Sequence, residues 1–137
     1  MSARSFLDTN ILVYADDGDS PEKQQRAIEI ILEHRAAGTS VVSLQVLQEY
    51  FAITTRKLGT DPGVARRKIE VLAQLDVVAP TLDDLLAAID LHRDHQVSIW
   101  DALIVRAAQR SGCAVLLTED LQDGRVFEGL KVVNPFR

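Results

Sequence analysis

Residues 5–10 read SFLDTN, and this short stretch places an aspartate inside an apolar run that extends to Val13. Burying a carboxylate in apolar surroundings is costly unless it is paired or coordinates a metal. Residues 5–7 resemble a short strand that ends at Asp8, and a helical pattern follows from Thr9. Asp8 therefore needs either a local structural role or partner groups from elsewhere in the chain.

The size and composition of the chain fit one globular domain over residues 1–137. Hydrophobic residues make up 47% and charged residues 26% of its 137 residues, as in soluble proteins. A single cysteine, Cys113, excludes an internal disulfide and favours a reducing compartment. No apolar run approaches the ~20 residues of a membrane helix, and the start MSARSFLD lacks a signal-peptide layout. We therefore expect a cytoplasmic protein without membrane contact.

Short apolar strands alternate with helical segments along the chain. Strands are expected at residues 5–7, 40–43, 77–79, 114–117 and 130–133. Helices are expected at residues 9–16, 20–38, 44–57, 61–75, 81–95 and 98–112, several of them opened by Ser, Thr or Asp caps. This alternation predicts an α/β fold with a central parallel sheet of about five short strands flanked by helices. Ligands of such sheets bind beyond the carboxyl ends of the strands, where Asp8 lies.

Four acidic residues stand out by their context. Asp8 and Asp120 each follow a strand, whereas Glu49 and Asp101 lie on helices with mostly apolar neighbours. Each has an ordinary alternative, because Asp8 and Asp101 could serve helix capping, Glu49 could be solvated and Asp120 could lie in a turn. If the four converge, their repulsion requires a divalent cation, and oxygen-only ligands select Mg²⁺ or Mn²⁺ over zinc. The usual task of such a site is to activate water for phosphodiester hydrolysis.

Four motifs follow one another along the chain, namely LDTN at 7–10, SLQVLQEYF at 43–51, SIWDALIVRAA at 98–108 and LLTEDLQDG at 116–124. Their order and spacing strongly resemble the PIN domain and, more narrowly, the VapC-type ribonuclease toxins of bacterial toxin–antitoxin pairs. The resemblance spans Phe6 to about Val133. It implies a Mg²⁺- or Mn²⁺-dependent endoribonuclease that acts on RNA, forms a homodimer and is inhibited by a cognate antitoxin protein.

The resemblance also implies roles for individual residues. It assigns metal binding and catalysis to Asp8, Glu49, Asp101 and Asp120. The fourth acid usually lies two residues after a threonine, here Thr118, although Glu119 and Asp123 are also available. Thr9 or Thr118 would orient a carboxylate by hydrogen bonding, and Asn10 either does the same or caps the following helix.

The charged and reactive residues outside this set have simpler interpretations. A net charge of −5 argues against general nucleic-acid binding and predicts recognition of RNA shape or of single-stranded loops. Candidate RNA contacts, which could equally be solvated helix faces, are Arg56, Lys57, the basic residues 66–68, Arg106 and Arg110. Cys113 is expected in the core, and His34, His92 and His95 lack the partners of a zinc site.

Two other functions remain open from the sequence. One is a phosphohydrolase with Asp8 as the nucleophile, but such enzymes place a second acid two residues later, where this chain has Asn10. The other is a non-catalytic binding domain that retains the acids without activity.

Overall fold

The computed structural model describes residues 3–137, which form six helices and six strands. The helices are α1 (Thr9–Tyr14), α2 (Pro21–Ala37), α3 (Leu44–Lys57), α4 (Pro62–Leu72), α5 (Leu82–His95) and α6 (Ile99–Arg110). The strands are β1 (Arg4–Leu7), β2 (Ser40–Ser43), β3 (Asp76–Val78), β4 (Cys113–Leu117), β5 (Val126–Phe127) and β6 (Leu130–Val133). Helices and strands therefore alternate through most of the chain.

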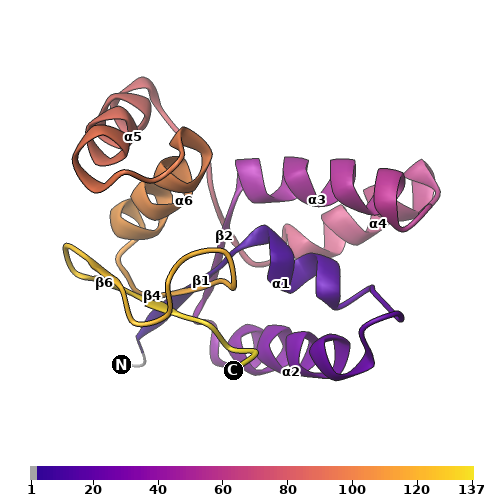
Figure 1. The fold of residues 1–137 in the computed structure, drawn as a ribbon. Coiled ribbons are helices and arrows are strands. Elements are labelled where there is room, and N and C mark those ends of the chain that lie inside the picture. The colour runs from indigo at the N-terminus through magenta and orange to yellow at the C-terminus, as the bar shows by residue number, and fades with distance from the viewer. Residues whose placement is uncertain (1–2) are drawn as a thin grey trace.

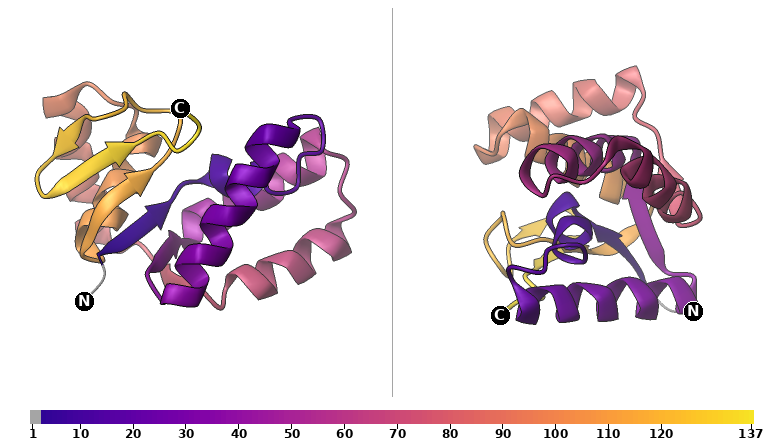
Figure 2. Two further views of the ribbon diagram at one scale, coloured as in Figure 1. Left: turned by 90° about the horizontal axis from the view of Figure 1, so that it is seen from below. Right: turned by 90° about the vertical axis from the view of Figure 1, so that its right-hand side faces the viewer.

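The strands form one mostly parallel sheet with the order β3-β2-β1-β4-β6-β5. All neighbouring strands are parallel except β5, which pairs antiparallel with β6. Helix α2 lies on one side of the sheet, and α3, α5 and α6 lie on the other (Figure 1; Figure 2, right). Strands β1 and β4 are adjacent at the centre, so the residues that follow Leu7 and Leu117 leave the sheet side by side.

Local signals in the sequence set the ends of several helices. The Ser43 hydroxyl accepts a hydrogen bond from the Val46 amide and begins α3 directly after β2. Thr81 and Asp84 form a reciprocal capping box at the start of α5. Helix α2 ends at Gly38, whose φ of 70° suits glycine in the left-handed region.

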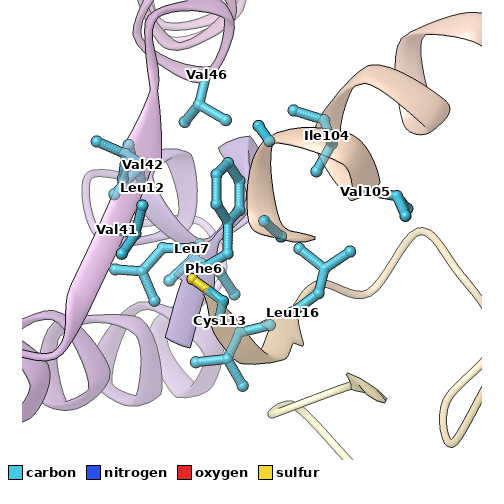
Figure 3. Packing of buried hydrophobic residues seen from close by; sticks show 14 of the residues in the cluster. Phe6, Leu7, Leu12, Val41, Val42, Val46, Ile104, Val105, Cys113 and Leu116 are labelled. Atoms are coloured by element: carbon cyan, nitrogen blue, oxygen red, sulfur yellow. The ribbon is translucent and has the colours of Figure 1, made fainter. Parts of the chain in front are cut away.

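The hydrophobic core lies on the central strands and the helices packed against them. Phe6 of β1 is fully buried at its centre, near Val46 of α3, Ile104 of α6 and Leu116 of β4 (Figure 3). Cys113 belongs to the same cluster with 4% of its surface exposed, which confirms its predicted place in the core. The core thus holds β1 and β4 rigidly up to the residues at which they end.

All five predicted strands are confirmed, and the prediction missed only β5. This strand has two residues and depends on a hairpin with β6, so it carries no periodic pattern of its own. Helix α4 ends at Leu72, three residues earlier than expected. Within residues 3–137, none of the helices combines the length and the apolarity needed to cross a membrane.

Candidate active site

An acidic cleft of about 280 Å³ lies at the carboxyl ends of β1 and β4. All four predicted acids line it, and each comes from a different segment: the end of β1, helix α3, the first turn of α6 and the loop after β4. These acids are Asp8, Glu49, Asp101 and Asp120. The structure therefore brings together four carboxylates that are up to 112 positions apart in the sequence (120 − 8 = 112).

Asp8 is the most buried of these acids, with 5% of its surface exposed. Its Oδ1 accepts a hydrogen bond from the Thr9 amide at 2.7 Å, and its Oδ2 accepts one from the Thr118 hydroxyl at 2.8 Å. Burial raises the pKa of Asp8 from 3.8 to about 7. The two hydrogen bonds lower the pKa and oppose this rise, whereas the negative charges of Asp120 and Glu49 add to it. Asp8 is thus both the N-cap of α1 and a carboxylate that needs a positive partner.

Polar residues next to Asp8 hold the other acids in place. The Thr9 hydroxyl donates to Glu49 Oε1 at 2.8 Å. Asn10 Nδ2 donates to Thr118 Oγ1 and to Asp120 Oδ2, both at 3.1 Å. Thr9 and Thr118 thus each donate a hydrogen bond to a carboxylate of the cleft, as the prediction of an orienting role requires. Asn10 donates to Asp120, while Asp8 rather than Asn10 caps the helix.

Thr118 is the centre of this network. It is fully buried, donates to Asp8 and accepts from both Asn10 and the Asp120 amide. Because one hydroxyl joins the ends of β1 and β4, the relative position of Asp8 and Asp120 depends on it.

Asp101 reaches the cleft from the first turn of α6. The Ser98 hydroxyl caps this helix by accepting from the Asp101 amide at 3.0 Å, while the Asp101 carboxylate lines the cleft. Burial raises the pKa of Asp101, a hydrogen bond from Ser98 opposes this, and the charge of Asp120 raises the pKa further. The first turn of α6 is thus capped by Ser98 and also places the Asp101 carboxylate in the cleft.

The two alternative fourth acids have different surroundings. Asp123 is absent from the cleft lining, and its Oδ1 accepts from the Asn134 amide at 2.8 Å while Oδ2 lies 4.0 Å from Arg137. Glu119 does line the cleft, but it is bound by the Tyr14 hydroxyl and by Lys23 Nζ at 2.9 Å. Asp120 is therefore the better placed residue for the fourth position.

Several residues of the cleft have no signal in the sequence. Asp17 is buried and lines it, although its sequence context, DDGD, is typical of a surface turn. Tyr14 and Trp100 also line it, and both would be assigned to the core from their apolar neighbours. Tyr14 is the last residue of α1 and Asp17 lies three residues after it, so both reach the cleft through the direction in which this short helix leaves β1.

The basic candidates mostly have acidic partners away from the cleft. Arg106 Nε and Arg110 Nε lie 3.0 and 2.8 Å from the carboxylate oxygens of the buried Asp84. Burial would raise the pKa of Asp84, but hydrogen bonds from Thr81 and Arg106 and the positive charge of Arg110 lower it. The interpretation of Arg106 and Arg110 as RNA contacts is therefore not supported, because both serve the capping box of α5.

Among the other basic candidates, one reaches the cleft. Arg66 is paired with Glu70, and Lys68 Nζ lies 2.7 Å from Asp16. Lys57 at the end of α3 lines the cleft. It has no ion-pair partner among residues 3–137.

The cleft offers the donor chemistry of a Mg²⁺ or Mn²⁺ site. Its donors are carboxylate oxygens and the buried Oδ1 of Asn10, which accepts no hydrogen bond from the residues that the structure describes. Burial and neighbouring negative charges raise the pKa values of Asp8 and Asp101, so a bound cation would stabilise their ionised forms. However, no three carboxylate, histidine or cysteine side chains within residues 3–137 already surround one point as ligands would. The residues fit such an ion by type and location, and binding would require some carboxylates to turn inward.

Comparisons with known proteins agree with this fold. The chain is similar to a toxin–antitoxin complex from Klebsiella pneumoniae, with a TM-score of 0.69 and 22% identity over 96% of this chain and 97% of that one. It is similar to Mycobacterium tuberculosis VapC20, described as a toxin that cleaves the sarcin–ricin loop, with a TM-score of 0.65 and 20% identity over 82% and 86% of the two chains. Rickettsia felis VapBC2, bound to a promoter DNA fragment, gives a TM-score of 0.69 and 18% identity over 93% and 96%. No curated protein sequence matches the chain.

The match to a protein family covers most of the chain. The family model of the PIN domain matches residues 5–126, which run from the start of β1 to β5 and include all four acids of the cleft. The order of the strands, the acids at their carboxyl ends and this match agree, and the chain belongs to the PIN domain family.

Proposed function

We propose that this protein is a Mg²⁺- or Mn²⁺-dependent endoribonuclease and the toxin of a toxin–antitoxin pair. The observation that carries the proposal is the buried Asp8, whose pKa is raised to about 7 at the centre of a cleft with three further carboxylates. Such an arrangement is unfavourable without a cation, and acidic sites of this kind hydrolyse phosphodiester bonds. The family match and the similarity to toxins in structure support the choice of RNA as the substrate.

Each acid has a role in the proposed reaction. Asp8, Asp101 and Asp120 would hold the ion, with Asp8 fixed by Thr118 and Asp120 fixed by Asn10. When bound, the ion supplies Lewis acidity toward water and positive charge that offsets the charge of the phosphate. Glu49 is held through Oε1 by Thr9, which leaves its Oε2 to orient the attacking water or to help hold the ion. A nucleophilic Asp8 is less well supported, because both of its oxygens accept hydrogen bonds.

The proposed partners follow from the same comparisons. One similar structure is a toxin–antitoxin complex and another is a toxin–antitoxin pair on its promoter DNA. We therefore propose a cognate antitoxin that binds this chain and inhibits RNA cleavage. We also propose a homodimer, which rests only on the resemblance of the sequence motifs to VapC-type toxins. Co-purification with the product of a neighbouring gene, followed by release of activity on its removal, would test the antitoxin.

The experiment that tests the function is RNA cleavage by the purified chain. We expect phosphodiester hydrolysis in Mg²⁺ or Mn²⁺, none in excess chelator, and recovery when the ion is restored. Cleavage that persists in chelator after repeated purification would contradict the proposed mechanism. A substrate consisting of DNA alone would contradict the proposed substrate class.

Replacing Thr118 by valine is expected to lower the rate of RNA cleavage by about 10- to 100-fold. Valine keeps the shape of this fully buried side chain but cannot donate to Asp8 or bind Asn10 and the Asp120 amide. Loss of the Thr118 hydrogen bond also raises the pKa of Asp8, so the pH–rate profile should shift to higher pH. Thr118→Ser keeps the hydroxyl and should retain most activity, and equal losses in both variants would contradict the role of this bond.

A further inference from the structure

We propose that Trp100 binds one unstacked base of the RNA substrate on its indole ring, beside the acids of the cleft. This inference rests on the proposed ribonuclease function and deepens it, because it names a residue that would hold one base of the substrate beside the acids. It adds Trp100 as a residue that binds and selects substrate, separate from the acids that perform the chemistry.

The exposure of Trp100 is the first observation. The side chain has 64% of its surface exposed, although tryptophan is usually among the more buried residues. It lines the cleft next to Asp101 in the first turn of α6. A large aromatic ring left in water at the edge of a candidate active site is typical of a ligand-binding surface.

The backbone around Trp100 is fixed, so its position in the cleft is defined. Ser98, two residues before Trp100, caps the helix by accepting from the Asp101 amide. Gln45 Nε2 of α3 donates to the Trp100 carbonyl oxygen at 3.2 Å and ties the start of α6 to α3. An aromatic ring on a rigid helix start binds a base with little loss of conformational entropy.

The rest of the cleft supplies the complementary chemistry for a nucleotide. Lys57 gives it an exposed cation for a phosphate, and the partly exposed side chain of Ile53 adds apolar surface. A nucleotide has the same combination of features, because an apolar base face adjoins a charged phosphate. Bases inside a duplex cannot stack on a protein ring, so this geometry selects a loop or a single strand.

The test uses the fact that Trp100 is the only tryptophan of the chain. When it is excited at wavelengths that the two tyrosines do not absorb, intrinsic fluorescence therefore reports on this ring alone. The protein is the full chain carrying Asp8→Asn, which keeps RNA intact, and the probes are a short single-stranded RNA and a backbone of the same length without bases. We expect saturable quenching by the RNA and little response to the abasic probe.

The second part of the test measures the affinity of Trp100 variants for a fluorescently labelled RNA. In the Asp8→Asn background, Trp100→Ala should raise the Kd for RNA by about 5- to 100-fold, whereas Trp100→Phe should retain most of the affinity. Leu82→Ala is the matched control, because Leu82 is 69% exposed and does not line the cleft. Thermal unfolding of each variant shows whether it folds as the parent does.

Each other outcome would overturn the proposal. RNA binding without quenching, equal quenching by both probes, or unchanged affinity of Trp100→Ala would exclude base stacking. Fluorescence that changes with protein concentration and no longer responds to RNA would instead assign Trp100 to a contact between two copies. RNA cleavage by the wild-type chain is measured separately, so failure of stacking alone is distinguishable from failure of the ribonuclease function.

Discussion

Asp8→Asn is expected to lower the rate of RNA cleavage by at least about 10³-fold, because it removes the central carboxylate of the proposed cation site. Asparagine has nearly the same shape and can still accept from the Thr9 amide, so the cap of α1 survives. The loss should therefore come from chemistry and cation binding rather than from unfolding. Rates measured on one labelled RNA with saturating Mg²⁺ or Mn²⁺ give the comparison.

Asp123→Asn is the matched control for this variant. It is the same chemical change a few residues from the cleft, and it preserves an oxygen that can accept from the Asn134 amide. We expect its activity to stay within a few fold of the wild type. Equal losses in the two variants, or full activity of Asp8→Asn, would mean that the active site is wrongly placed.

The second large effect concerns stability without added divalent ions. Asp8 has a folded-state pKa of about 7 against 3.8 in its ordinary state, so the folded protein holds this proton more tightly than the unfolded chain. Stability therefore falls as pH rises through this window, and the loss is complete above about pH 7. The expected loss is up to about 4 kcal/mol.

Asp8→Asn isolates this contribution from all other titrating groups. Relative to the wild type, the variant should gain stability progressively between about pH 4 and pH 7 and keep the gain at higher pH. Denaturant unfolding of both proteins at a series of pH values measures the difference. A constant difference across this range would show that Asp8 ionises normally in the folded protein.

Much of the fold could be predicted because its signals are local. The capping box of Thr81 and Asp84 and the proline after Ser20 mark helix starts within a few residues. Strand β5 could not be predicted in this way, since its two residues gain their structure from pairing with β6. Its place at the edge of the sheet depends on tertiary structure and on no periodic pattern.

In the candidate site too, some residues carry a local sequence signal and others depend on tertiary contacts. Asp8 and Asp120 could be predicted because Asp8 directly follows β1 and Asp120 lies three residues after the end of β4, and parallel strands end at one edge. The partners of the charged residues could not be predicted, because the ion pairs Arg106–Asp84 and Lys23–Glu119 join residues that come close only in the folded protein. The same holds for Trp100, whose apolar neighbours in sequence suggest burial although the ring is exposed.

Whether the cleft acids bind a divalent cation, as we propose, can be measured by titrating the protein with Mn²⁺. Paramagnetic resonance of free Mn²⁺ counts the ions bound by the metal-free protein without any need for RNA. We predict saturable binding by the wild type and by Asp123→Asn, and its loss in Asp8→Asn. Absence of saturable binding, or equal binding by Asp8→Asn, would contradict the account.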